Sequence, residues 1–168
     1  MSPILSQNAV ELISQSVAQT HRFGYRLGLL LQPGDVICLE GNLGSGKTCF
    51  VQGLGQALGV REVITSPTFT LIGEYRGSHQ TMPLFHIDVY RLDPLTDLDG
   101  VGLWDYLYGD GVCAIEWADR IREALPQEAL WVILRNCLDD SRRNIILEGH
   151  GERYEALLRQ YKRSVFGV

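Results

Sequence analysis

The chain lacks the excess of basic side chains with which proteins hold nucleic acid. It has 15 lysines and arginines against 20 aspartates and glutamates, and its formal net charge is −5. Direct nucleic-acid interfaces are built largely on phosphate contacts from a basic face. The charge balance therefore argues against direct RNA binding, and we expect any RNA to be met through a partner.

The N-terminus lacks targeting signals. Residues 1–10 contain no basic cluster and no long apolar run, whereas a signal peptide needs both and a membrane helix needs about 20 apolar residues. We expect no membrane span and a cytoplasmic protein.

The four cysteines lack metal-ligand spacing. No C-x-x-C pair occurs, and three of the four lie in apolar runs that resemble strands. The four histidines are equally scattered. We expect reduced, mostly buried thiols rather than a metal or redox site. The cysteines are Cys38, Cys49, Cys113 and Cys137.

Repeats, linkers and low-complexity tracts are also missing. The chain has 168 residues and is 45% hydrophobic, enough for one packed core. We expect a single domain over residues 1–168 that mixes helices and strands. The apolar pattern predicts helices over residues 8 to about 31 with a break near Gly24, 47–58 and 154–161, and weak helix around 103–107. It predicts strands over residues 36–39, 112–115, 130–134 and 144–147, and a hairpin from 69–75 and 82–90.

The strongest motif is a complete phosphate-binding loop directly after the predicted strand 36–39. Its glycines let backbone N–H groups point at phosphate oxygens, and the following helix directs its positive end there. In such Walker A loops the lysine bridges the β- and γ-phosphates and the hydroxyl takes one Mg²⁺ position. The loop is Gly41-Asn42-Leu43-Gly44-Ser45-Gly46-Lys47-Thr48.

Two acidic residues follow apolar strands and could complete the site. Asp88 ends the run 84–87, and Glu116 ends the run 112–115. Carboxylates at the ends of such strands emerge where an open α/β sheet binds its ligands. Neither is followed by a second acid, so the metal-holding and water-orienting roles could be divided between the two strands. Which acid has which role stays open, and an isolated acid at a strand end can also be a solvated cap.

Other candidates carry weaker signals. Ser66 and Thr68 lie where a mobile loop could meet the γ-phosphate or the metal, although Ser-Pro-Thr is also an ordinary turn. Arg91 and the pair Arg142-Arg143 could neutralise phosphate charge. The guanine-reading sequence Asn-Lys-x-Asp is missing, which favours an adenine nucleotide.

Together these motifs resemble the bacterial TsaE (YjeE) family of ATPases. The resemblance covers almost the whole chain in order. Its motifs are the phosphate loop with the preceding Leu39-Glu40, Thr65-Ser66-Pro67-Thr68-Phe69-Thr70-Leu71, His86-Ile87-Asp88-Val89-Tyr90-Arg91-Leu92 and Ile115-Glu116-Trp117. It implies an α/β, P-loop NTPase-like three-layer fold with a mixed sheet, helices on both faces and a β-hairpin.

The resemblance also implies a function in making threonylcarbamoyladenosine next to the tRNA anticodon. The family does not transfer the group: its members bind the TsaB and TsaD proteins, and ATP hydrolysis supports repeated turnover by TsaD. The tRNA is then met only indirectly, and we expect the free protein to be a monomer. ATP and Mg²⁺ are the implied cofactors.

By motif, the resemblance assigns catalytic roles to Lys47, Asp88 and Glu116. Asp88 is the Walker B-like acid and Glu116 a second essential acid. Metal contacts are expected from Thr48, Glu116 and Asp88. Nucleotide contacts are expected from Gly41, Asn42, Leu43, Gly44, Ser45, Gly46, Lys47, Thr48, Cys49, Thr68 and Trp117. Cys49 stands where the family often has threonine, and Ala118-Asp119 where Pro-Glu often follows the tryptophan.

Two other functions stay open from the sequence. A small-molecule kinase could use the same loop, with Arg135, Arg142 and Arg143 in a lid that binds phosphate. Alternatively, a nucleotide-controlled binding module would only set partner affinity. A hydrolase that lacks its full set of catalytic groups is expected to be slow alone.

Overall fold

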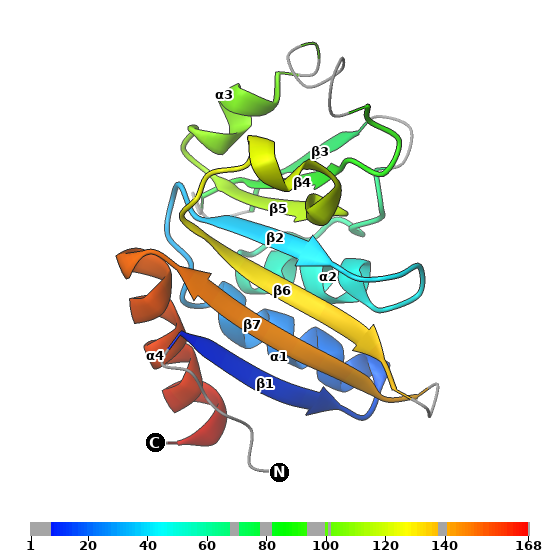
Figure 1. The fold of residues 1–168 in the computed structure, drawn as a ribbon, viewed down its shortest axis with the longest axis vertical. Helices are drawn as coiled ribbons and strands as arrows, with labels where there is room; N and C mark the ends of the chain where they lie inside the picture. The colour runs from blue at the N-terminus through cyan, green and yellow to red at the C-terminus, as the bar shows by residue number, and fades with distance from the viewer. Residues whose placement is uncertain are drawn as a thin grey trace.

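A seven-stranded mixed sheet forms the centre of the computed structural model (Figure 1). The structure describes residues 8–67, 71–77, 82–93, 100, 102–137 and 141–167. The strand order is β1-β7-β6-β2-β5-β4-β3. The strands are β1 Ala9–Ser14, β2 Val36–Glu40, β3 Ile72–Tyr75, β4 Leu84–Asp88, β5 Val112–Glu116, β6 Ala129–Asn136 and β7 Arg143–His150.

The middle of the sheet is parallel and its edges are antiparallel. Strands β4, β5, β2 and β6 run parallel to one another, whereas β3, β7 and β1 are joined by antiparallel pairing. Parallel strands are buried on both faces and read as continuous apolar runs, and all five residues of β4 and of β5 are buried. The predicted hairpin is confirmed as β3 and β4.

Helices cover both faces of the sheet, as expected for a three-layer α/β fold. In Figure 1, α1 and α2 lie behind the sheet and the 3₁₀ helix η2 lies in front of it. Buried residues form two clusters, one that includes residues of α1, α2 and α4 and one that includes residues of α3 and η2. The helices are α1 Val17–Gly28, α2 Lys47–Ala57, α3 Leu103–Leu107, η2 Ala118–Ala124 and α4 Glu152–Phe166.

The first predicted helix is wrong in its first half. Residues 9–14 form the edge strand β1, in which Val10 and Leu12 are buried while Glu11 and Ile13 are exposed. This period-two burial follows from antiparallel pairing with β7. The helix begins only after Ser16, whose Oγ accepts a hydrogen bond from the Gln19 N–H at 3.1 Å and caps it.

The expected break at Gly24 is also wrong. Gly24 lies inside α1, and a Cβ there would come within 2.2 Å of the Phe50 carbonyl oxygen in α2. Gly53 of α2 is equally crowded, since a Cβ would lie 2.1 Å from the His21 carbonyl oxygen. The two glycines therefore allow the helix backbones to touch.

An ion pair between the partly exposed Arg153 and the buried Asp35 anchors α4 to the start of the central strand β2. Arg153 donates from Nε to Asp35 Oδ1 at 3.0 Å and from Nη2 to Oδ2 at 2.7 Å. The next residue, Tyr154, accepts the Val36 N–H on its hydroxyl oxygen at 2.8 Å. Burial raises the pKa of Tyr154 to about 12. These contacts fix the beginning of the strand that leads into the phosphate loop.

The cysteine prediction is confirmed in part. All four thiols are free, and Cys38 and Cys113 are buried in β2 and β5. Burial raises the pKa of Cys113 to about 12. Cys49 in α2 and Cys137 after β6 are only partly buried. Among the described helices, none is long and apolar enough to cross a membrane.

We expect Gly53→Ala to lower the free energy of unfolding by at least about 2 kcal/mol, because the new methyl group meets backbone atoms of α1 that cannot move aside. An unhindered glycine-to-alanine change in a helix would instead stabilise it by about 1 kcal/mol. Urea unfolding measures the difference. Gln56→Ala, at an exposed site of the same helix, is the control and should change stability by less than about 0.5 kcal/mol. A Gly53→Ala protein as stable as the original would contradict the packing argument.

Candidate active site

The phosphate loop connects β2 to α2, as the sequence predicts. Gly44 and Gly46 have φ of 78° and 102°, conformations that favour glycine. Gly41 is needed for space, because a Cβ would lie 2.6 Å from the Leu134 carbonyl oxygen. The helix begins at Lys47, and the first N–H groups of a helix have no carbonyl partner within it. The loop thus has the backbone geometry of an anion site.

Lys47 lies folded against its own loop. Its Nζ donates to the carbonyl oxygen of Gly41 and, at 3.0 Å, to that of Asn42. The same ammonium group lies 4.0 Å from the centroid of the Trp117 ring. Burial lowers the pKa of Lys47, and the nearby carboxylates of Glu116, Asp88 and Asp119 act in the opposite direction.

The two candidate acids lie side by side but have different partners. Asp88 and Glu116 are paired residues at the ends of β4 and β5. Glu116 accepts the Thr48 hydroxyl hydrogen bond, at 3.0 Å to Oε1 and 3.1 Å to Oε2. This follows from the strand order, because β5 is the direct neighbour of β2. Glu116 is therefore the acid that contacts the phosphate-loop helix.

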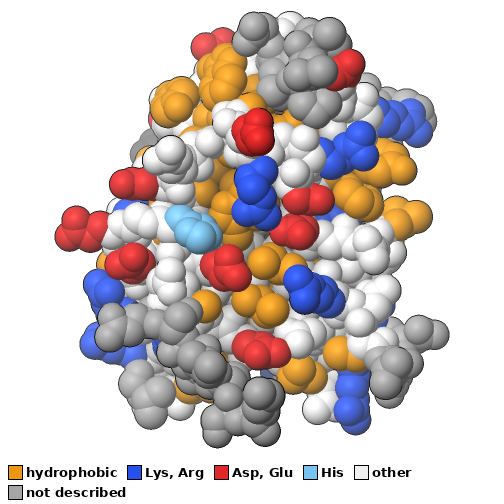
Figure 2. All heavy atoms as spheres, in the orientation of Figure 1, with side chains coloured by type: hydrophobic (Ala, Val, Ile, Leu, Met, Phe, Trp, Pro, Cys, Tyr) orange, Lys and Arg blue, Asp and Glu red, His pale blue; other side chains and the backbone are white. Residues whose placement is uncertain are grey.

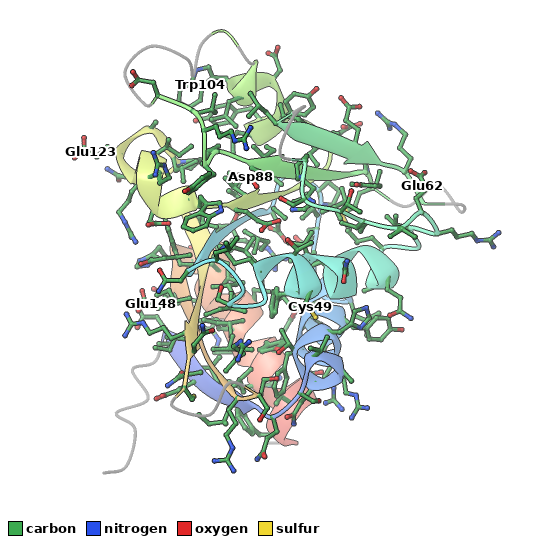
Figure 3. The ribbon with its side chains drawn as sticks, turned by 90° about the vertical axis from the view of Figure 1, so that its right-hand side faces the viewer. Cys49, Glu62, Asp88, Trp104, Glu123 and Glu148 are labelled. Carbon is green, nitrogen blue, oxygen red and sulfur yellow. The ribbon has the colours of Figure 1, made fainter. Side chains whose placement is uncertain are left out.

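Asp88, one strand further away, contacts the segment that the sequence marks as a possible switch. Its Oδ2 accepts a hydrogen bond from Ser66 Oγ at 2.8 Å, and its Oδ1 accepts one from the Tyr90 N–H at 2.9 Å. Figure 3 shows Asp88 on the strand side of α2, opposite the side where Cys49 faces α1. The predicted contact residue Thr68 lies outside the described residues.

Sequence reasoning missed His86. This buried side chain of β4 shares a hydrogen bond between its Nε2 and Glu116 Oε2. The available signal was its position two residues before Asp88, which places both side chains on one face of the strand. A pattern confined to one strand cannot identify a partner on the next.

A cavity of about 510 Å³ joins the phosphate loop to both acids. Trp117 borders it in a left-handed backbone conformation with φ of 62°, and its ring centroid is 4.7 Å from that of Tyr90. Its lining residues are Leu43, Gly44, Ser45, Gly46, Lys47, Thr48, Cys49, Ser66, Asp88, Tyr90, Arg91, Glu116 and Trp117. The structure thus brings most of the predicted site residues together.

A second cavity of about 250 Å³ shares Gly44, Gly46 and Cys49 with the first. Arg143 lines it and donates from Nη2 to the Gly44 carbonyl oxygen at 3.1 Å. Arg135 instead borders a third cavity, of about 380 Å³, beside Gly41 and Asn42. The predicted arginines are therefore spread around the loop.

The residues present fit a bound nucleotide phosphate and Mg²⁺. Within the described part of the chain, the buried hydroxyl of Ser45 has no hydrogen-bond partner. Such an unpaired polar atom inside a phosphate loop is suited to a ligand. The hydroxyl and carboxylate oxygens of Thr48, Glu116 and Asp88 are the ligand type that Mg²⁺ prefers. No group of three or more His, Cys, Asp and Glu side chains suited to a metal occurs in the ranges described.

Comparison with known proteins decides the family. The family model described as "Threonylcarbamoyl adenosine biosynthesis protein TsaE" matches residues 14–145. The chain belongs to the TsaE family. The proteins named tRNA threonylcarbamoyladenosine biosynthesis protein TsaE from Treponema pallidum and Bacillus subtilis are 45% and 44% identical to it. These matches cover 77% and 79% of this chain and 94% and 80% of the two relatives.

A solved structure shows the same fold as this TsaE family member. The crystal structure of Bacillus subtilis YdiB superimposes with a TM-score of 0.79 at 36% identity, over 92% of this chain and 95% of that one. The match confirms the expected fold class and includes the mixed sheet that carries the site.

We expect a polyphosphate that occupies the loop to change the fluorescence of Trp117, because Lys47 must turn its ammonium group from the indole ring toward the anion. The chain has three tryptophans. The measurement is a titration with inorganic triphosphate in a Trp104→Phe, Trp131→Phe background. Adding Lys47→Met should abolish the change. An unaltered spectrum despite calorimetrically measured binding would show that Lys47 stays on the ring.

Proposed function

We propose that this TsaE family protein is an ATPase, slow alone, whose hydrolysis of ATP supports the TsaB–TsaD transferase in forming threonylcarbamoyladenosine on cytoplasmic tRNA. One observation carries the enzymatic part: the phosphate-loop hydroxyl of Thr48 is bonded to the strand-end acid Glu116 within the cavity that contains Lys47. Family membership supports the pathway.

The geometry of the loop supports ATP binding. The phosphates lie against the backbone N–H groups at the start of α2, and Lys47 turns from its loop carbonyls to the β- and γ-phosphates. The nucleoside extends toward the smaller cavity, which is continuous with the loop at Gly44, Gly46 and Cys49. Arg143 braces that side of the loop through the Gly44 carbonyl.

The two acids have separate tasks in this proposal. Thr48 and Glu116 would hold Mg²⁺, which would supply positive charge to offset that of the phosphates. Asp88 lies one strand further from the phosphate loop than Glu116. It accepts hydrogen bonds from the Ser66 hydroxyl and the Tyr90 N–H. From there it orients the water that attacks the γ-phosphate.

A partner completes the site. The apolar side chain of Leu43, at the edge of the cavity, is 87% exposed, and that of Tyr90 is 50% exposed. Both are suited to being covered by another protein.

An arginine supplied by a partner can raise the rate of nucleotide hydrolysis 10³- to 10⁵-fold, which lowers the activation free energy by about 4–7 kcal/mol. On the face shown in Figure 2, the described acidic and basic side chains are interspersed rather than gathered into one basic patch.

The proposal predicts slow ATP hydrolysis by the purified protein and stimulation by a matching TsaB–TsaD pair, because the missing catalytic group comes from the interface. Phosphate release from ATP measures both rates. Lys47→Ala is the blank, since it removes the cation that holds the phosphates. Demonstrated ATP binding without stimulation by the pair would contradict the proposal, and acceptor-dependent ADP release would favour a kinase.

The two acids should differ in their response to Mg²⁺. Glu116→Gln should raise the Mg²⁺ concentration needed for half-maximal hydrolysis, because the charged metal ligand is lost. Asp88→Asn should lower the maximal rate, by 10²-fold or more if the water is poorly oriented, with little change in Mg²⁺ requirement. Titrating Mg²⁺ at saturating ATP separates the effects. The same response in both variants would refute the division of tasks.

A further inference from the structure

His86 occupies a buried position directly behind the acid that contacts Thr48. It lies in the middle of β4, opposite Ala114 of β5, and is 0% exposed. Its Nε2 is bonded to Glu116 Oε2, whereas its Nδ1 has no hydrogen-bond partner among the described residues. The histidine therefore makes one polar contact there, and that contact is with a proposed catalytic residue.

The proposed metal-holding role of Glu116 decides which nitrogen carries the proton. A carboxylate that holds a metal ion is ionised and only accepts hydrogen bonds, so in this proposal Nε2 is the donor. A neutral imidazole has one N–H, which leaves Nδ1 as a lone pair. An empty acceptor at Nδ1 is consistent with its lack of a partner in the part of the chain that the structure describes.

We infer that His86 is a positioning residue: its Nε2–H holds Glu116 Oε2 so that the carboxylate stays directed at the Thr48 hydroxyl and the metal position beside it. The inference rests on the proposed function of the site. Carboxylates that bind metal ions are commonly held by such outer hydrogen bonds, and loss of these bonds typically costs 10- to 100-fold in metal affinity or activity.

The surroundings of Glu116 explain why this support is needed. Glu116 is buried, with 3% of the residue exposed. Its described side-chain partners are Thr48 on the helix side and His86 on the strand side. With His86 removed, the Thr48 hydroxyl alone would orient the group, and the carboxylate could rotate away from the metal position.

Three substitutions separate positioning from simple packing. His86→Gln places an amide N–H near the position of Nε2 and should keep the bond. His86→Asn is polar but too short to reach Glu116, and His86→Leu fills space without a donor. The matched control is His150→Leu, which removes a surface histidine whose Nε2 lies 3.6 Å from Glu148 Oε2.

The first measurement is the affinity of the full-length protein for the non-hydrolysable analogue AMP-PNP, by calorimetry with and without Mg²⁺. We expect the Mg²⁺-dependent gain in affinity to fall 10- to 100-fold in His86→Leu and His86→Asn. It should stay within about threefold in His86→Gln and be unchanged in His150→Leu. The affinity for AMP-PNP without Mg²⁺ should be equal in all variants. A general packing defect would lower this affinity as well. If His86→Leu fails to fold, the comparison of Asn with Gln carries the test.

The second measurement needs no ligand. Long-range ¹H–¹⁵N spectra of the free protein should show the His86 ring protonated at Nε2 and unprotonated at Nδ1, with a changed Nε2 signal in Glu116→Gln. A proton on Nδ1 alone, or an undiminished Mg²⁺ gain in a folded His86→Asn protein, would overturn the inference. The inference would also be overturned if Mg²⁺ did not raise the affinity of the wild-type protein for AMP-PNP. If Mg²⁺ raises this affinity but the protein hydrolyses no ATP, even with TsaB–TsaD, only the proposed function is overturned.

Discussion

The hydrogen bond between Thr48 and Glu116 is the constraint on which the candidate site depends. It joins the first turn of α2 to the end of β5, so the helix that starts at the phosphate loop has a fixed position relative to the parallel strands. That bond is possible only because β5 is the neighbour of β2 in the sheet. The strand order therefore decides which of the two acids contacts the helix.

The rest of the fold holds the two ends of that contact in place. On the strand side, the ion pair of Asp35 with Arg153 fixes the beginning of β2 to α4. On the helix side, the glycine contacts with α1 fix α2. Removing Arg153 would be costly, because the buried carboxylate of Asp35 would be left without compensation. The parts of the molecule remote from the loop thus determine its position.

Much of the site was predictable because its signals are local. The phosphate loop, the acids that end β4 and β5, and the hairpin are each encoded in a few consecutive residues. The edge strand β1 was not predictable in this way, since Val10, Ile13 and Val17 also fit a helical spacing. Its strand conformation depends on pairing with β7, more than 120 residues later in the chain. His86 was missed for the same reason, because its partner Glu116 belongs to another strand.

The contact between Gly24 and α2 has a consequence for how this sequence can change during evolution. Any side chain at Gly24 or Gly53 would meet backbone of the other helix, so neither position can accept a larger residue by a single substitution unless α1 and α2 move apart. Gly53 is five residues after Thr48 on the same helix, and moving α2 would shift Thr48 relative to Glu116. Selection for the chemistry of the site therefore also acts on these two glycines, although they contact neither acid and their direct role is in helix packing.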